Sequence, residues 1–172
     1  MRKLFLFTFL VLTSTSAFAQ KDYAKDVASM EAILTALYDV ISGPAGEKRD
    51  WDRMRNLFIP EARLMPSGLN AQTGKVSYVS WTPEQYIKEA GSNLEKNGFF
   101  EVEIARKVEK FGTVTHVFST YESRRNADDE KPFVRGINSI QLLEAHDRWY
   151  IVNIFWMGET QQFPIPDKYL KN

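Results

Sequence analysis

The 172-residue chain contains no cysteine, so it can form neither a disulfide nor a zinc cluster built on thiolates. Its only histidines are His116 and His146, too few for a metal site made of imidazoles. Neither sign of charge is in excess, because 22 Lys and Arg residues balance 22 Asp and Glu residues. That balance argues against the strongly basic surface with which proteins bind nucleic acids. We therefore expect no metal and no nucleic-acid partner.

The sequence also lacks a glycine-rich phosphate loop, a nucleophile elbow and a histidine-glutamate metalloprotease motif. No cofactor is expected on these grounds, and no residue can be assigned as catalytic.

A long apolar run is missing, but a short one follows the start of the chain. Arg2 and Lys3 precede the apolar run 4–12, and a small-residue motif follows at 17–19 (Ala-Phe-Ala). This order is typical of a secretory signal peptide, and the run is shorter than the roughly 20 residues that span a bilayer. We predict a signal peptide over residues 1–19 and export to a bacterial periplasm or secretion. No membrane insertion is expected after cleavage.

Residues 20–172 show no linker, internal repeat or low-complexity tract. Their number lies within the usual roughly 100–200 residues of one domain and is sufficient for a hydrophobic core without disulfides. We predict a single domain over this range.

Three helices are predicted in the first half of the domain. Apolar residues spaced three and four apart predict an amphipathic helix over Asp22–Ile41. Asp50 can cap a short second helix, which Pro60 would stop. A capping box over 82–85 (Thr-Pro-Glu-Gln) predicts a third helix that ends near Asn97. Between the second and third helices, short strands are expected at 62–65 and 76–81, with a loop at 66–74.

Four long strands are predicted in the second half, roughly at 99–111, 113–125, 133–145 and 148–158. In the first of them, apolar residues such as Val102 and Ile104 alternate with charged ones such as Glu101 and Glu103. This alternation predicts that the apolar side chains are buried and that the glutamates face water.

The last strand is apolar at both alternating sets of positions. Trp149, Ile151, Phe155 and Met157 are expected on one face, with Tyr150, Val152, Ile154 and Trp156 on the other. A single layer of helices covers one face of a sheet, so the second apolar face predicts an interface. We expect a homodimer that forms through the sheet.

Helices followed by a long antiparallel sheet indicate an α+β protein. The order of elements resembles the nuclear-transport-factor-two-like superfamily, which includes SnoaL-like polyketide cyclases and ketosteroid isomerases. The segments that carry the resemblance are 37–43, 50–58, 60–64, 111–122, 135–142 and 148–156. The resemblance implies a cone of three N-terminal-half helices packed on a curved, mostly antiparallel sheet of about six strands. It also implies a pocket between the first helix and the concave face of the sheet.

Polar residues among the apolar positions of the helix and strands are candidates to line that pocket. The predicted ligand-binding residues are Tyr38, His116, Thr120, Glu122, Asn138 and Trp156. His116, Thr120 and Glu122 share one strand face, but His116 and Glu122 lie roughly 20 Å apart and cannot form a catalytic pair. A hydrogen-bonded structural histidine and a Glu122 ion pair with Arg124 or Arg135 are the alternatives for these positions.

A ketosteroid isomerase site would need a carboxylate base and acid donors. Tyr38 could supply a donor, but the early strand 62–65 (Ala-Arg-Leu-Met) offers no carboxylate. The resemblance therefore implies no particular mechanism, since one fold hosts many functions.

Three functions are compatible with the sequence. The first is an exported domain that binds a small, partly apolar ligand in the cone. The second is a cofactor-independent isomerase, cyclase or dehydratase, which needs an acid and a base in one dry pocket. The third is a dimeric protein-interaction module of the cell envelope.

Overall fold

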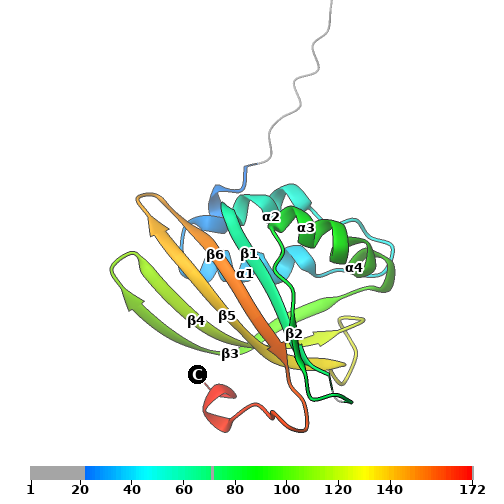
Figure 1. Cartoon of the computed structure of the whole chain (residues 1–172). Coiled ribbons are helices and arrows are strands. Elements are labelled where there is room, and N and C mark those ends of the chain that lie inside the picture. The colour runs from blue at the N-terminus through cyan, green and yellow to red at the C-terminus, as the bar shows by residue number, and fades with distance from the viewer. Residues whose placement is uncertain (1–21, 71, 172) are drawn as a thin grey trace, which may run out of the picture.

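Six strands of the described part of the chain form one curved sheet, in the order β2-β1-β6-β5-β4-β3 (Figure 1). The computed structural model describes residues 22–70 and 72–171. The strands are β1 (Phe58–Leu69), β2 (Val76–Tyr78), β3 (Phe100–Phe111), β4 (Val114–Arg124), β5 (Val134–Ala145) and β6 (Arg148–Gly158). All neighbouring strands are antiparallel except β1 and β6, which are parallel.

The helices gather on one side of this sheet, as Figure 1 shows. They are α1 (Met30–Ile41), α2 (Trp51–Leu57), α3 (Pro83–Tyr86) and α4 (Ser92–Asn97). A π-helical turn, Ile87–Gly91, joins α3 to α4, so the predicted third helix is one helical segment with an irregular middle. The predicted α+β class and the mostly antiparallel sheet of about six strands are confirmed.

Of the predictions about the helices, the start of the first helix was wrong, and the two predicted caps are confirmed. The first helix is shorter than expected, because Ser29 caps α1 and accepts a hydrogen bond from the Ala32 amide at 3.0 Å. A separate 3₁₀ turn, Ala24–Val27, precedes it. The Asp50 cap and the Thr82 capping box are both present as predicted.

The strand expected at 62–65 extends over Phe58–Leu69 and takes in the first four residues of the predicted loop, 66–69. Its two prolines are accommodated because the pairing of β1 with β6 is irregular between Phe58 and Arg63, around Pro60. At Pro66 the backbone carbonyl still accepts a hydrogen bond, from the Val79 amide at 3.2 Å.

The faces of β3 are the reverse of the prediction. Glu101 and Glu103 point toward the helices, whereas Val102 and Ile104 are 47% and 36% exposed. Two serines of β4 explain this reversal, since they donate hydrogen bonds to the two carboxylates on the helix side. Alternation alone could not reveal which side of the strand carries hydrogen-bond partners.

The faces of β6 also differ from simple alternation. Its pairing with β5 shifts between Asn153 and Ile151, so that Val152 is an extra residue, a β-bulge. Because the bulge exchanges the faces, Ile151 and Ile154 both reach the core, at 0% and 5% exposure. Phe155 instead lies on the outer face and is 46% exposed.

The core lies between α1, α2 and the concave face of the sheet. Its largest fully buried apolar side chains come from α1, α2 and the strands: Ile33, Leu34, Met54, Leu57, Val117, Ile140, Leu142 and Ile151. The spacing of Ile33, Leu34 and Leu37 along α1 matches the amphipathic period that the sequence shows.

The chain after β6 crosses to the outer face of the sheet and ends there in a short 3₁₀ turn, Asp167–Tyr169 (Figure 1). Thr120 donates a hydrogen bond to the Tyr169 carbonyl at 2.6 Å, and the rings of Phe118 and Tyr169 are 4.9 Å apart. We call residues 159–171 the C-terminal segment. It covers part of the face on which the sequence predicts dimerisation.

The predicted signal peptide, residues 1–19, lies outside the described residues. Within the described part of the chain, no helix has the length and apolar character needed to cross a bilayer.

Candidate functional site

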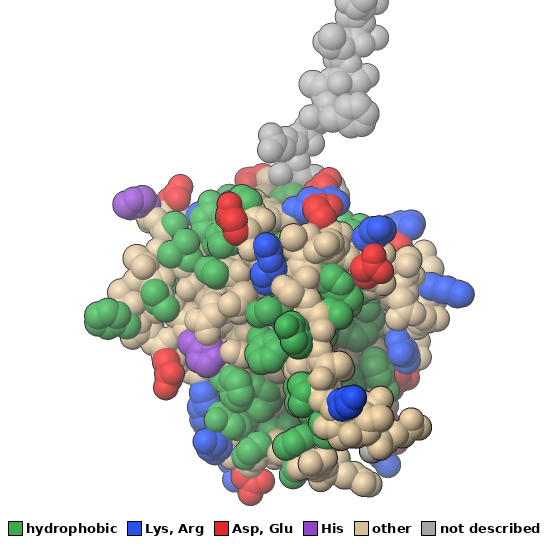
Figure 2. Space-filling model, viewed as in Figure 1, with side chains coloured by type: hydrophobic (Ala, Val, Ile, Leu, Met, Phe, Trp, Pro, Cys, Tyr) green, Lys and Arg blue, Asp and Glu red, His purple; other side chains and the backbone are tan. Residues whose placement is uncertain are grey.

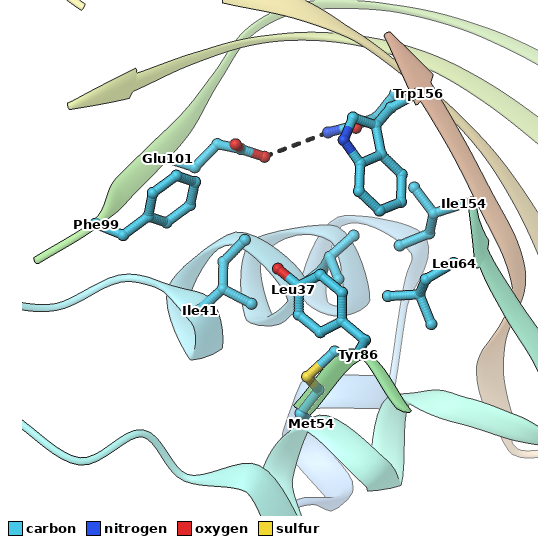
Figure 3. Close-up of a pocket in the computed structure, with 10 residues that line it drawn as sticks. Leu37, Ile41, Met54, Leu64, Tyr86, Phe99, Glu101, Ile154 and Trp156 are labelled. Carbon is cyan, nitrogen blue, oxygen red and sulfur yellow. Dashed lines mark hydrogen bonds between the residues drawn. The ribbon is translucent and has the colours of Figure 1, made fainter. Parts of the chain in front are cut away.

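A small pocket lies between the helices and the concave face of the sheet, with a volume of about 100 Å³ (Figure 3). Its walls are mostly apolar: Leu37, Ile41, Met54, Leu64, Phe99, Ile154 and Trp156. Three residues with polar groups complete the lining, namely Tyr86, Glu101 and Asn138. We call this space the inner pocket.

Glu101 occupies one wall of the inner pocket and is held by side chains of two neighbouring strands. Ser123 donates to one carboxylate oxygen at 2.7 Å, and the Asn138 amide lies 3.4 Å from the other. The backbone is fixed as well, because the Glu101 amide donates to the Ser42 hydroxyl at 3.0 Å. Sheet and α1 therefore position this carboxyl together.

Burial raises the pKa of the Glu101 carboxyl to about 7, from an ordinary value of 4.5. The hydrogen bonds from Ser123 and Asn138 oppose this shift, since they stabilise the ionised form. A carboxyl with a pKa near 7 is present in both protonation states at neutral pH. It can therefore donate or accept a proton there.

Tyr38 connects Asn138, which contacts Glu101, to the buried hydroxyl of Ser119. Its hydroxyl lies 2.6 Å from the Ser119 hydroxyl and accepts a hydrogen bond from Asn138 at 3.1 Å. Ser119 in turn donates to Glu103, which forms an ion pair with Arg106. Burial raises the pKa of Tyr38, and the nearby Glu101 charge acts in the same direction. The phenol is therefore neutral and serves as a hydrogen-bonding hub.

Tyr86 faces Glu101 from the helical side of the inner pocket. In Figure 3 its hydroxyl points into the pocket, between the labelled apolar side chains. Its ring packs edge-on against Trp81 and Trp156, with centroids 6.3 Å and 6.4 Å away. Burial raises the pKa of Tyr86. The neutral phenol is a hydrogen-bond donor for a molecule in the pocket.

The predicted ligand-binding residues fall on two different faces of the sheet. Tyr38, Asn138 and Trp156 lie at the concave face, and the last two line the inner pocket. His116, Thr120 and Glu122 share one face of β4, as predicted, but it is the outer face.

The contacts of His116 and Glu122 match the alternatives to ligand binding that the sequence leaves open, a hydrogen-bonded histidine and an ion pair with Arg124. His116 lies 3.0 Å from the Ser139 hydroxyl, and Glu122 pairs with Arg124 at 2.7 Å. Thr120 bonds to the C-terminal segment. Their separation from the inner pocket follows from strand alternation, since Ser119, Tyr121 and Ser123 occupy the concave face.

Glu101 was missed as a site residue because its neighbours in sequence form a regular alternating pattern. The available signal was the surplus of hydroxyl and amide residues at the alternating positions of β4 and β5. Ser119, Ser123 and Asn138 are buried polar side chains that need partners, and the β3 carboxylates are those partners.

Residues 22–70 and 72–171 contain no group of three or more His, Asp or Glu side chains placed to hold a metal ion. The inner pocket, at about 100 Å³, is also smaller than the 300–1,000 Å³ typical of cofactor and drug-sized ligands.

Several solved structures are similar in fold to the chain. One is a protein of unknown function with a cystatin-like fold from Nostoc punctiforme, with a TM-score of 0.57, 9% identity, and coverage of 77% of this chain and 90% of that one. Another is described as a candidate dehydratase of the NTF2-like family from Streptomyces avermitilis, with a TM-score of 0.52, 11% identity, and coverage of 78% and 96%.

A third similar structure is a candidate calcium/calmodulin-dependent protein kinase II association domain from Xanthomonas campestris, with a TM-score of 0.53, 14% identity, and coverage of 76% and 86%. No protein-family model and no curated protein sequence matches the chain. The chain has the nuclear-transport-factor-two-like fold, so the resemblance inferred from the sequence is confirmed at the level of the fold. The fold alone does not choose a function.

Proposed function

We propose that the inner pocket binds a small, partly apolar molecule whose polar group contacts Glu101 and Tyr86. The observation that carries this proposal is the placement of a carboxyl, a phenol and the Asn138 amide in a pocket whose other lining side chains are apolar. Apolar walls with a few converging polar groups are the usual composition of a small-molecule site.

The size of the inner pocket limits what it can hold. A cavity of 150 Å³ accommodates benzene, so about 100 Å³ suits a smaller molecule. A molecule of this size has few atoms with which to gain binding energy, so dissociation constants in the millimolar range are expected.

The experiment is an NMR titration of the folded protein with 1-propanol, butanone and propionamide. Binding is expected to shift the resonances of residues that line the inner pocket, such as Leu37 and Ile154. In Ile41→Phe, which fills the space, these shifts should vanish, whereas Glu122→Gln on the outer face serves as the matched control. If none of the three probes perturbs the pocket resonances of the wild-type protein, ligand binding at this site is rejected.

A second candidate function is cofactor-independent proton transfer, favoured by the pKa of about 7 at Glu101. In its ionised form Glu101 takes a proton from the carbon beside a carbonyl group, and the electron pair moves onto the carbonyl oxygen. Tyr86 stabilises the enolate by donating a hydrogen bond to that oxygen. In a β,γ-unsaturated ketone, return of the proton from Glu101 to the γ-carbon gives the conjugated isomer. In a β-hydroxy ketone, the departing hydroxyl takes that proton and leaves as water, which gives the α,β-unsaturated ketone.

Proton transfer is tested by incubating the protein with butanone in deuterated water and following the loss of the proton signals beside the carbonyl. The wild-type protein should accelerate the exchange, and Glu101→Gln should lower the rate to that of the solvent. Tyr86→Phe is expected to reduce it by roughly 10²-fold or more, the usual effect of removing one oxyanion donor. Binding without accelerated exchange would leave the ligand-binding function and remove the catalytic one.

Export through a signal peptide at residues 1–19 is also a proposal. It is supported by the basic start, the short apolar run and the small-residue motif. Mass spectrometry of the protein from a bacterial periplasmic fraction tests it, with Gln20 expected as the first residue.

A homodimer through the sheet remains a proposal as well. Support comes from the partly exposed apolar side chains of the outer face, such as Phe155 at 46% exposure. The molecular mass in solution, measured by light scattering, tests it. Phe155→Asp is expected to convert the dimer to a monomer.

A further inference from the structure

A second and larger pocket lies on the outer face of the sheet, between the strands and the C-terminal segment. Its volume is about 620 Å³, within the 300–1,000 Å³ typical of small-molecule sites. Sheet residues Phe118, Ile137 and Met157 form its floor, and Phe163 and Ile165 of the C-terminal segment form a wall. We call it the outer pocket. It is separate from the inner pocket that the proposed function concerns.

The wall of the outer pocket is held at both ends. Near its start, Glu159 pairs with Arg135 and accepts a hydrogen bond from the Ile165 amide at 3.0 Å. At its end, Thr120 holds the Tyr169 carbonyl. The C-terminal segment is thus fixed over the sheet, yet it leaves a space rather than packing down on the strands.

Apolar side chains remain uncovered around this space. Phe155 on the sheet and Phe163 in the C-terminal segment are 46% and 49% exposed. Figure 2 shows hydrophobic side chains gathered over the lower part of the molecule, with basic side chains and a histidine beside them. Covering such aromatic surface is favourable by roughly 25 cal/mol per Å².

A depression with a different character adjoins the outer pocket. It is lined by Lys107, Val108, Glu109, His116, Phe118, Lys168 and Tyr169, and its volume is about 520 Å³. The two spaces share Phe118 and Tyr169 as lining residues. They also meet where the His116 ring lies 3.0 Å from the Ser139 hydroxyl, because Ser139 lines the outer pocket.

The charges of this depression favour an anion. Lys107 and Lys168 supply two ammonium groups, and Lys168 lies over the Tyr169 ring at 4.7 Å. The carboxylate of Glu109 opposes them, but it is 87% exposed and 3.9 Å from His116. A carboxylate in this depression can pair with the two ammonium groups in place of solvent. His116 also lines the depression, with its ring nitrogens 3.0 Å from the Ser139 hydroxyl and 3.9 Å from Glu109.

We propose that the outer pocket binds an anionic amphiphile of the alkyl carboxylate class. The alkyl chain lies between the sheet and the C-terminal segment, against Phe155 and Phe163. The carboxylate lies in the adjoining depression, beside Lys107, Lys168 and His116. This occupant matches both parts of the surface, because an apolar space opens beside a cationic one.

The test is isothermal titration calorimetry of the whole protein with decanoate, with 1-decanol and decylamine as probes of equal chain length. Decanoate should bind most tightly, decanol more weakly and decylamine weakest. Lys107→Gln combined with Lys168→Gln should weaken decanoate about fivefold or more and leave decanol unchanged. Both lysines are exposed in the protein alone, so the double variant is expected to fold normally.

Phe163→Ala tests the apolar part of the site and should weaken decanoate and decanol alike, by about tenfold. Glu101→Gln, in the inner pocket, should leave decanoate binding unchanged, which separates this proposal from the proposed function. Absence of decanoate binding, or equal affinity for all three probes, would overturn it. The proposed homodimer and this ligand both use Phe155, so they are alternative occupants of the outer face. A dimer that covers this face and excludes decanoate would therefore overturn the proposal too.

Discussion

On the concave face of the sheet, polar side chains are buried and hydrogen-bonded, and the inner pocket is small. On the outer face, apolar side chains such as Phe155 stay partly exposed, and the pocket beneath the C-terminal segment is about six times larger. Along a strand, the side chains of residues two apart lie on the same face of the sheet, and those of adjacent residues lie on opposite faces. β5 illustrates this, since Asn138 and Ile140 serve the concave face while Ile137 and Ser139 serve the outer one.

The two faces of the sheet therefore differ in kind: buried hydrogen bonds concentrate on the concave face, and partly exposed apolar side chains on the outer face. The helices cover the concave face and bury polar side chains such as Ser119, Ser123 and Asn138, so each of these groups needs a hydrogen-bond partner within the protein. The C-terminal segment covers part of the outer face and is anchored near its two ends, through Glu159 and through Tyr169. The space between these anchors is the outer pocket, in which we propose that an alkyl carboxylate binds.

The largest contrast is expected between Ile140→Ala and Ile137→Ala, two identical truncations on opposite faces of β5. Ile140 is fully buried, so its truncation should lower the free energy of unfolding by about 3–4 kcal/mol. Ile137 borders the outer pocket, so its truncation should lower the free energy of unfolding by only about 1 kcal/mol. Urea unfolding measures both. Equal losses would mean that the outer face is packed as tightly as the core.

A pH effect specific to the concave face is expected from Glu101. Its pKa is about 7 in the folded protein and 4.5 otherwise, so between these values the folded state binds more protons than the unfolded state. The free energy of unfolding should therefore fall as pH rises through this window, by up to about 3 kcal/mol. Below pH 4.5, where Glu101 is protonated in both states, it contributes no pH dependence to the free energy of unfolding.

Urea unfolding of the wild-type protein and Glu101→Gln, at about pH 5 and about pH 8, measures this pH effect. The free energy of unfolding of the wild-type protein should be lower at the higher pH because Glu101 ionises in the core. In Glu101→Gln this contribution should be missing. Glu122→Gln on the outer face should behave like the wild-type protein. The interpretation fails if wild-type and Glu101→Gln show the same pH dependence.

Removal of the Tyr38 hydroxyl tests the polar network itself. In Tyr38→Phe, Ser119 and Asn138 each lose a hydrogen-bond partner within the core. A loss of about 1–2 kcal/mol is expected from these buried groups. Thermal unfolding measures it, and an unchanged melting temperature would indicate that water takes the place of the hydroxyl.

The smallest effect is expected for Thr120→Val beneath the C-terminal segment. The variant loses the hydrogen bond to the Tyr169 carbonyl but keeps its shape, so global stability should fall by less than about 1 kcal/mol. Hydrogen exchange should nevertheless become faster in residues 159–171, because one anchor of the segment is gone. Unchanged exchange there would show that the Phe118–Tyr169 contact alone holds the segment.

The sequence by itself determined the succession of elements and the class of the fold. The caps at Asp50 and Thr82, the amphipathic spacing of α1 and the four long strands are local signals, and short-range chemistry decides them. Polar or aromatic residues that interrupt an apolar pattern gave the six candidates for the pocket, Tyr38, His116, Thr120, Glu122, Asn138 and Trp156, but not the face on which each of them lies.

The tertiary structure alone decided which face each residue serves. The bulge at Val152 exchanges the faces within β6, and the serines of β4 draw Glu101 and Glu103 inward against the apparent pattern of β3. His116, Thr120 and Glu122 share a face, as the sequence indicates, yet only packing shows that this face lies beneath the C-terminal segment. The physical reason is that alternation gives a strand two sides, whereas the neighbours brought together by folding determine which side is buried.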